Sequence, residues 1–362
     1  MSNFFITGGA GFIGKRMSAA LVASGNKVSI FDNFHPQVHK NPSILIAELE
    51  SLGVKVVRGN VCDSEFLARS MLSSGANVIV HLAAETGTGQ SYDLPSRYCE
   101  VNVTGTANVV EAARAVKAKG VDLQRVILAG SRAVYGEGAC LDDSNNRVTA
   151  IPRKSQDLLS GDFSPKNQHG VNVNPIPSRA SSTVVSPSSI YASTKLMQEF
   201  ILQQGLEQTG IQVGILRLQN VYGAGQSLNN PYTGVLSIFC QQLLEGKVLN
   251  IFEDGEIVRD FVNVSDVVSA FVALCEIEVL PNTIIDIGSG RPDTILGVAN
   301  LMSEIMGFQD IRTQVTGQFR TGDIRYAVAD ISDAKEKLAW SPRVGLRAGI
   351  TELVEWARIS NA

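Results

Sequence analysis

The chain has 362 residues, enough for two domains of about 150 residues each. Hydrophobic residues make up 44% of it and charged residues 18%, which excludes a disordered chain because a sizeable apolar core can be buried. The net charge of −4 gives no basic footprint for binding nucleic acid or an anionic membrane.

The N-terminus and the cysteines favour a soluble, cytoplasmic protein. Met1 is followed almost at once by an apolar strand and a glycine turn, without the basic and apolar segments of a signal peptide. No apolar run approaches the ~18 residues of a membrane-spanning helix. The cysteines are scattered, so we expect free thiols in a reducing compartment and neither disulfides nor a metal site. They are Cys62, Cys99, Cys140, Cys240 and Cys275.

Short apolar runs alternate with amphipathic stretches over the first 219 residues. The runs are rich in β-branched residues and predict buried parallel strands, while the stretches between them predict helical crossovers. We therefore expect an α/β fold with a doubly wound parallel sheet. Strands are expected at 4–6, 28–31, 54–57, 78–80, 126–128 and 213–216, and helices at 15–23, 63–73 and 101–119.

Residues 137–188 interrupt this alternation. They hold five of the 12 prolines and show no sustained period. A loop of this length is uncommon inside a compact domain, so we expect an insertion over the strand ends, as a lid or as a mobile loop without a role. Shorter elements after residue 219 predict a smaller α+β domain over 220–362, with a return to the sheet around 261–286.

A glycine-rich turn, TGGAGFIG at residues 7–14, follows the first strand and opens a helix. Glycines let the backbone turn tightly and approach a pyrophosphate, and the helix N-terminus offers unpaired amides to it. Asp32 ends the second strand, where a carboxylate accepts both ribose hydroxyls of NAD and repels the 2′-phosphate of NADP. An aspartate there can also simply cap a helix. Together with the glycines, it predicts that the chain binds NAD.

Tyr191 and Lys195 lie four residues apart, on one face of a predicted helix. A tyrosine has an unperturbed pKa near ~10, and a nearby cation favours its phenolate. Such a tyrosine can take a proton from a sugar hydroxyl while the hydride of the same carbon goes to NAD. Ser131 ends the fifth strand, where its hydroxyl can bind the substrate oxygen or cap a turn.

These motifs resemble those of the extended short-chain dehydrogenases/reductases, in the NAD-dependent epimerase/dehydratase family, whose sheet is a Rossmann fold. The resemblance covers nearly the whole chain and includes HLAAE at 81–85, YASTK at 191–195 and RDFVNVSD at 259–266. It implies that Ser131, Tyr191 and Lys195 form the catalytic triad. The expected cofactor-binding residues are Gly8, Gly11, Phe12, Ile13, Gly14, Asp32, Asn33, Asn60, Val61, Leu82, Ala83, Ala84, Asn102, Tyr191 and Lys195.

The residues after Ser131 narrow the reaction that the resemblance implies. An Asp-Glu pair follows the first triad residue in the 4,6-dehydratases of this family, and the sugar-acid decarboxylases carry Glu at the second of these positions. Arg132 and Ala133 stand here and cannot do that work. The stretch at 217–234 most resembles dTDP-L-rhamnose 4-epimerases. Besides Ser131, the expected substrate-binding residues, at family positions that hold the nucleotide diphosphate and ribose, are Asn220, Arg259, Arg320 and Asp323.

We therefore expect an NAD-dependent nucleotide-sugar epimerase that oxidises C4 transiently and returns the hydride to the opposite face. A nucleotide-4-keto-sugar reductase or dehydrogenase on the same fold is the alternative. A non-catalytic NAD-binding sensor is a third possibility, against which the intact triad argues. The resemblance also implies a homodimer through a four-helix bundle, formed by the helix at 101–115 and the helix that carries Tyr191. His81 is expected to have a structural role.

Overall fold

The computed structural model describes residues 1–228, 234–280, 284–310, 312–320 and 322–361. Residues 229–233, part of the motif at 217–234, lie outside this description. The chain divides into two compact units. Unit one comprises Met1–Ser131, Ile190–Arg217 and Val268–Ile284, and unit two comprises Arg132–Ser189, Leu218–Val267 and Ile285–Ala362.

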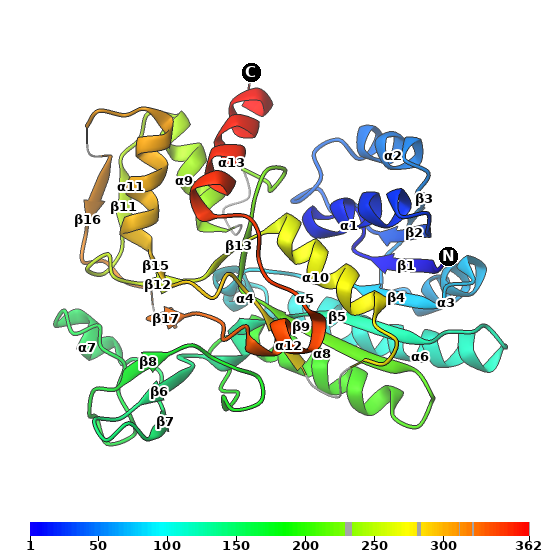
Figure 1. Cartoon of the computed structure of the whole chain (residues 1–362), viewed down its shortest axis with the longest axis horizontal. Helices are drawn as coiled ribbons and strands as arrows, with labels where there is room; N and C mark the ends of the chain where they lie inside the picture. Colours follow the sequence, from blue (N-terminus) through cyan, green and yellow to red (C-terminus); the bar gives the residue numbers. More distant parts are fainter. Residues whose placement is uncertain (229–233, 281–283, 311, 321, 362) are drawn as a thin grey trace. The chain divides into compact units, whose positions relative to one another are not determined.

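A seven-stranded parallel sheet has the strand order β14-β9-β5-β4-β1-β2-β3 (Figure 1). The chain runs outward from β1 to β3, then returns to the other side of β1 with β4, so the sheet is doubly wound. The predicted fold class is therefore confirmed, and all six predicted strands are present. The strands are β1 (Asn3–Thr7), β2 (Lys27–Asp32), β3 (Lys55–Arg58), β4 (Val78–His81), β5 (Arg125–Ser131), β9 (Gln212–Leu218) and β14 (Ile284–Ile287).

Strand β1, which precedes the glycine-rich turn, lies between β2 and β4 in the sheet. Its residues Phe4–Thr7 pair in parallel register with Val28–Phe31 of β2 on one side and with Val78–His81 of β4 on the other. Phe5 and Ile6 are fully buried. Burial on both faces explains the unbroken apolar run in the sequence, and each such side chain contributes about 1.5–3 kcal/mol of transfer free energy.

Three helices, α3 (Ser64–Ser74), α6 (Gly105–Ala118) and α8 (Ile190–Leu206), pack side by side in unit one. Leu67, Val110 and Leu202 belong to the apolar core that they share with the sheet. A π-helical turn, η1 (Cys99–Thr104), leads into α6. The other helices with residues in this unit are α1 (Phe12–Ala23), α2 (Pro42–Ser51), α4 (Thr88–Asp93), α5 (Pro95–Tyr98) and α10 (Val264–Glu276).

Unit two has a separate apolar core between α9 (Val235–Leu244), α11 (Ile295–Met306) and α13 (Leu346–Asn361). None of the helices in the described part of the chain is long and apolar enough to cross a membrane. Outside residues 137–188, the other elements of unit two are the 3-10 helix η2 (Arg132–Tyr135), the pair β10 (Asn220–Tyr222) and β13 (Phe261–Asn263), and the pair β11 (Leu249–Ile251) and β16 (Thr313–Val315). Strand β12 (Val258–Arg259) lies between β15 (Asp293–Thr294) and β17 (Tyr326–Ala327), and helix α12 (Ser332–Leu338) follows β17.

The segment 137–188 belongs to unit two and contains strands and a helix that could not be predicted from its sequence. Strands β6 (Ala139–Leu141), β7 (Arg147–Thr149) and β8 (Asn174–Ile176) form an antiparallel sheet, and α7 (Ser155–Leu159) follows β7. Each strand has only three residues, so an alternation of apolar and polar side chains is too short to be seen. We call this segment the insertion.

Candidate active site

The glycine-rich turn joins β1 to α1 in a shape that only glycines allow. Gly8 has a φ of +66°, and a Cβ added there would lie 2.7 Å from the backbone nitrogen of Ala83. A Cβ on Gly14 would lie 2.6 Å from the Cα of Gly9. Gly11, by contrast, would meet only the Gly8 carbonyl oxygen, and no side chain caps the helix that starts at Phe12. The first amides of α1, including those of Phe12 and Ile13, therefore suit a pyrophosphate.

Asp32, at the end of β2, is fixed beside this turn. Its Oδ2 accepts a hydrogen bond from the Ala10 amide at 3.0 Å, and its Oδ1 accepts one from the Phe34 amide at 2.8 Å. The remaining lone pairs of the carboxylate suit the two hydroxyls of a ribose. The next residue, Asn33, is exposed, and its Oδ1 accepts from the amide of His35. The turn and this carboxylate together fit a dinucleotide such as NAD.

The other predicted cofactor residues follow β3 and β4 or lie in η1. Asn60 is exposed and Val61 buried after β3, while Leu82, Ala83 and Ala84 are half-buried after β4. Parallel strands bring their carboxyl ends to one edge of the sheet, so all of these residues except Asn102 lie at the edge that carries the glycine turn. Asn102 is fully buried and joins two segments. Its Oδ1 accepts from the Glu85 amide at 2.7 Å, and its Nδ2 donates to Thr194 Oγ1 at 3.0 Å.

The three predicted catalytic residues all belong to unit one. Ser131 is buried at the carboxyl end of β5, and Tyr191 and Lys195 lie on the first turns of α8, which packs against β5. The Tyr191 amide donates to Ser91 Oγ at 3.1 Å, and the Tyr191 ring meets that of Tyr98 edge to face at 6.4 Å between centroids. Ser91 and Tyr98 were not expected from the sequence, because no local pattern links them to Tyr191.

Lys195 is buried, and burial lowers the pKa of its ammonium from 10.5 to about 8, while Glu199 partly offsets the effect. The ammonium donates to Gln198 Oε1. Gln198 donates in turn to Thr106 Oγ1 at 2.8 Å. Gln198 was not predicted from the sequence, although its place three residues after Lys195 on one helix face was an available signal.

His81 supports the same network from the end of β4. Its Nδ1 lies 2.7 Å from Thr7 Oγ1 and its Nε2 lies 2.9 Å from Thr106 Oγ1. Burial, helped by the charge of Lys195, lowers the pKa of His81 to about 3, so the imidazole is neutral at physiological pH. These contacts agree with the structural role expected for His81.

Unit two brings two of the predicted substrate residues into contact. The guanidinium of Arg259, at the end of β12, donates to Asp323 Oδ1 at 2.6 Å. Arg320 lies over the ring of Phe252, 4.8 Å from its centroid. Asn220 starts β10, and its amide donates to the carbonyl of Asp260 at 3.0 Å.

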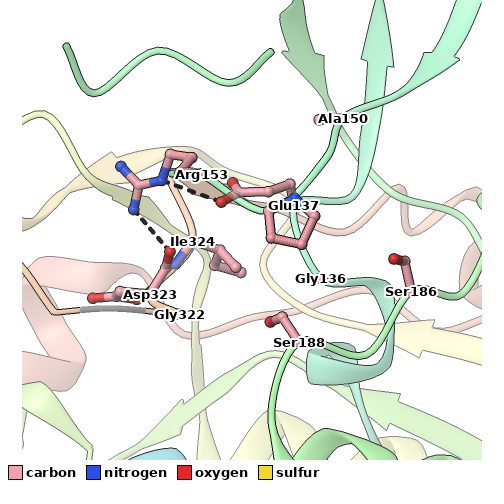
Figure 2. A pocket seen from close by; sticks show the side chains of 10 residues that line it. Gly136, Glu137, Ala150, Arg153, Ser186, Ser188, Gly322, Asp323 and Ile324 are labelled. Carbon is pink, nitrogen blue, oxygen red and sulfur yellow. Dashed lines mark hydrogen bonds and ion pairs between the residues drawn. The ribbon is translucent and has the colours of Figure 1, made fainter. Parts of the chain in front are cut away.

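A pocket in unit two is lined by Asp323 and by residues of the insertion (Figure 2). Figure 2 shows Glu137 and Arg153 beside Asp323, with Ser186 and Ser188 on the other side. The described residues contain no group of three metal-ligating side chains.

Comparison with known proteins identifies the family. A profile of the NAD-dependent epimerase/dehydratase family matches residues 4–288. The chain belongs to this family. Membership confirms the predicted family and NAD as the cofactor, and the protein is an enzyme of this NAD-dependent family.

Several known proteins resemble the chain over nearly its whole length. A dTDP-L-rhamnose 4-epimerase of Burkholderia thailandensis is 39% identical over 97% of this chain and 93% of its own. The solved UDP-glucose 4-epimerase of Thermotoga maritima, in complex with UDP-glucose, is 28% identical with a TM-score of 0.77, over 99% of this chain and all of its own. MoeE5, solved with UDP-glucose and NAD, is 25% identical with a TM-score of 0.74, over 99% of this chain and all of its own.

Proposed function

We propose that the chain is a 4-epimerase of a nucleotide-diphosphate sugar, with dTDP-L-rhamnose as the first candidate substrate. The observation that carries the proposal is a serine, tyrosine and lysine set without a second acid–base pair, because Arg132 and Ala133 follow Ser131. The 39% identity to a dTDP-L-rhamnose 4-epimerase supports this choice of sugar nucleotide. In this proposal the parts of the first 219 residues that belong to unit one, with the return around 261–286, bind NAD, and residues 220–362, together with the insertion, bind the nucleotide sugar.

In this proposal Ser131, Tyr191 and Lys195 carry out the proton transfers. NAD, when bound, supplies a hydride acceptor and donor. Tyr191 takes the proton of the C4 hydroxyl as that carbon becomes a carbonyl, and gives it back when the hydroxyl forms again. Ser131 hydrogen-bonds the same oxygen. The ammonium of Lys195 favours the phenolate of Tyr191, and the low dielectric around this buried cation strengthens the effect.

Epimerisation also requires the oxidised sugar to present its other face. The nucleotide diphosphate must therefore stay bound while the sugar turns. Arg259 and Arg320 suit this task because a guanidinium binds two phosphate oxygens at once. Asn220 contributes an amide, and Asp323 accepts from the ribose hydroxyls. Holding the reacting groups in place in this way is worth several kcal/mol of the barrier.

The test is turnover of dTDP-L-rhamnose without added cofactor, followed by proton NMR of the two C4 epimers. Tyr191→Phe should lower kcat about a thousandfold while NAD stays bound. Tyr92→Phe is the matched control, because Tyr92 is 81% exposed on α4, and it should keep full activity. Near-normal turnover of Tyr191→Phe would contradict the base assignment. Net formation of reduced nicotinamide, seen by absorbance, would favour the nucleotide-4-keto-sugar reductase or dehydrogenase instead.

We also propose that the enzyme is a homodimer through α6 and α8. Met197 and Phe200 lie three residues apart on α8 and are 44% and 42% exposed, which leaves apolar surface on the helix side away from the core. A second copy would cover it and form a four-helix bundle. Light scattering should give a dimer for the wild type and a monomer for Phe200→Glu. A monomeric wild type would refute the dimer and leave the proposed reaction untouched.

A further inference from the structure

Arg153, in the insertion, is a buried cation with several partners in unit two. Its side chain is 3% exposed. Its Nε donates to Glu137 Oε1 at 3.2 Å, and its Nη1 donates to Glu253 Oε2 at 2.9 Å. Its Nη2 donates to the backbone carbonyl of Asp323 at 2.8 Å.

Glu137 binds the segment that carries Asp323, two residues further along the chain, at Arg325. Its Oε2 accepts a hydrogen bond from the backbone amide of Arg325 at 2.9 Å. Arg153 and Glu137 therefore hold the backbone on both sides of Ile324, and Figure 2 shows the two side chains bonded to each other next to Asp323. The carboxylate of Asp323 projects from this fixed backbone and accepts from Arg259.

We propose that Arg153 and Glu137 are positioning residues for the nucleotide of the substrate, and that the insertion acts through them. The inference rests on the proposed function, in which Asp323 accepts the ribose hydroxyls and Arg259 binds the diphosphate. Charge-assisted hydrogen bonds made by buried groups fix their partners firmly, and a carboxylate displaced by about 1 Å loses its bond to a hydroxyl. Replacing Arg153 or Glu137 should therefore free the segment that carries Asp323.

Arg153→Lys is the principal test, because lysine keeps the charge but has no fork with which to reach Glu137, Glu253 and the Asp323 carbonyl together. Calorimetry measures the binding of dTDP and of UDP. Steady-state turnover of dTDP-L-rhamnose gives KM and kcat. The dissociation constant and KM should rise about tenfold, the effect of losing one good hydrogen bond to the ligand, with kcat within about threefold of wild type.

Arg179→Lys is the matched control. Arg179 belongs to the same insertion and pairs with Asp333, at 2.8 and 2.9 Å, not with the segment around Asp323. Its variant should bind dTDP normally even if its melting temperature falls. Glu137→Gln, which keeps an acceptor for the Arg325 amide, should weaken nucleotide binding less than Arg153→Lys. Equal affinities for wild type and Arg153→Lys overturn the inference, whereas a wild type that binds neither nucleotide overturns the proposed function.

A second, independent observation concerns unit one, where two side-chain amides bridge the edge of the sheet. Gln37 Nε2 donates to Gln90 Oε1 at 3.2 Å, and Gln90 Nε2 donates to Gln37 Oε1 at 3.1 Å. Gln37 follows β2 and Gln90 lies in α4, which follows β4. Since β1 lies between β2 and β4, the bridge joins the segments that follow the two strands on either side of β1.

We infer that this amide bridge retains NAD, because the loops that it joins are those that flank the pyrophosphate position. An epimerase regenerates its cofactor in each cycle and gains from slow release. Gln90 is 6% exposed, so its replacement endangers folding, whereas Gln37 is half-buried and is therefore the residue to replace. The release of NAD can be measured whatever sugar the enzyme acts on, so this inference does not depend on the identity of the sugar.

The test measures exchange of bound NAD against excess isotopically labelled NAD by mass spectrometry. Gln37→Met should exchange NAD about tenfold faster than wild type, the combined effect of losing both hydrogen bonds of the bridge. Gln124→Met is the control, because Gln124 precedes β5 at the opposite edge of the sheet and is exposed. Unchanged exchange in Gln37→Met, or equal acceleration in both variants, overturns the inference.

Discussion

Replacing Lys195 by methionine should stabilise the fold at neutral pH while it removes the ammonium proposed to act in catalysis. Burial lowers the pKa of Lys195 from 10.5 to about 8, and this difference corresponds to roughly 3 kcal/mol of lost stability for the charged form. Methionine fills similar space without a charge. Loss of the hydrogen bond to Gln198 Oε1 costs about 1–3 kcal/mol in return. The net gain is therefore at most about 2 kcal/mol.

The pH dependence gives the sharper readout. Below pH 8 the lysine is charged in both the folded and the unfolded state, and the whole cost of burial is present. Between pH 8 and 10.5 only the unfolded chain binds the proton, so the wild-type free energy of unfolding rises with pH, by about 1.4 kcal/mol per unit. The Lys195→Met variant lacks this contribution, so its advantage should shrink as the pH rises.

Urea unfolding of both proteins at pH 7, 8 and 9 measures this difference. Each protein is measured without NAD and with saturating NAD, because a ligand of the folded state adds to apparent stability. A variant that is less stable than wild type at pH 7, by an amount that does not change with pH, would refute the reasoning. Loss of epimerase activity without a gain in stability would show only that the ammonium is needed.

Three further predictions use the same network and its neighbours. Since the pKa of His81 is held at about 3, wild-type unfolding free energy should fall by about 1.4 kcal/mol per pH unit below pH 6.5, and urea unfolding of His81→Gln should show a flatter profile. Glu199→Met removes the carboxylate that pairs with the buried guanidinium of Arg217 and should lower the free energy of unfolding by about 3–5 kcal/mol, seen as a lower melting temperature. Asp32→Ser should weaken NAD binding about tenfold or more and reduce the preference over NADP, as measured by calorimetry with both cofactors.

The central sheet could be predicted from the sequence because its strands are buried on both faces. Phe4, Phe5 and Ile6 form an unbroken apolar run for that reason, and the glycine turn that follows has a strict steric cause. The strands of the insertion could not be predicted, because three residues carry no measurable period. The π-helical turn at Cys99–Thr104 was not predicted either, because a single turn at the start of the predicted helix 101–119 is too short to show a period of its own.

The supporting side chains of the site escaped prediction for a different reason. Gln198 meets the imidazole of His81 across 117 residues of sequence, and Arg153 reaches the carbonyl of Asp323 across 170. Such pairs are fixed by the tertiary fold, and a single sequence contains no local signal for them. The triad could be proposed because Tyr191 and Lys195 are close along one helix and Ser131 ends a recognisable strand.

The seven-stranded sheet is assembled from stretches that lie far apart along the chain, and this has a consequence for synthesis on the ribosome. Strand β9 pairs with β14, which is translated some seventy residues later. Until β14 emerges, β9 presents an unpaired edge, the kind of surface on which nascent chains associate wrongly. A gene fragment that stops at residue 219 should therefore give an aggregating product, and nicotinamide-binding fragments of this enzyme should be designed to retain residues up to Ile287.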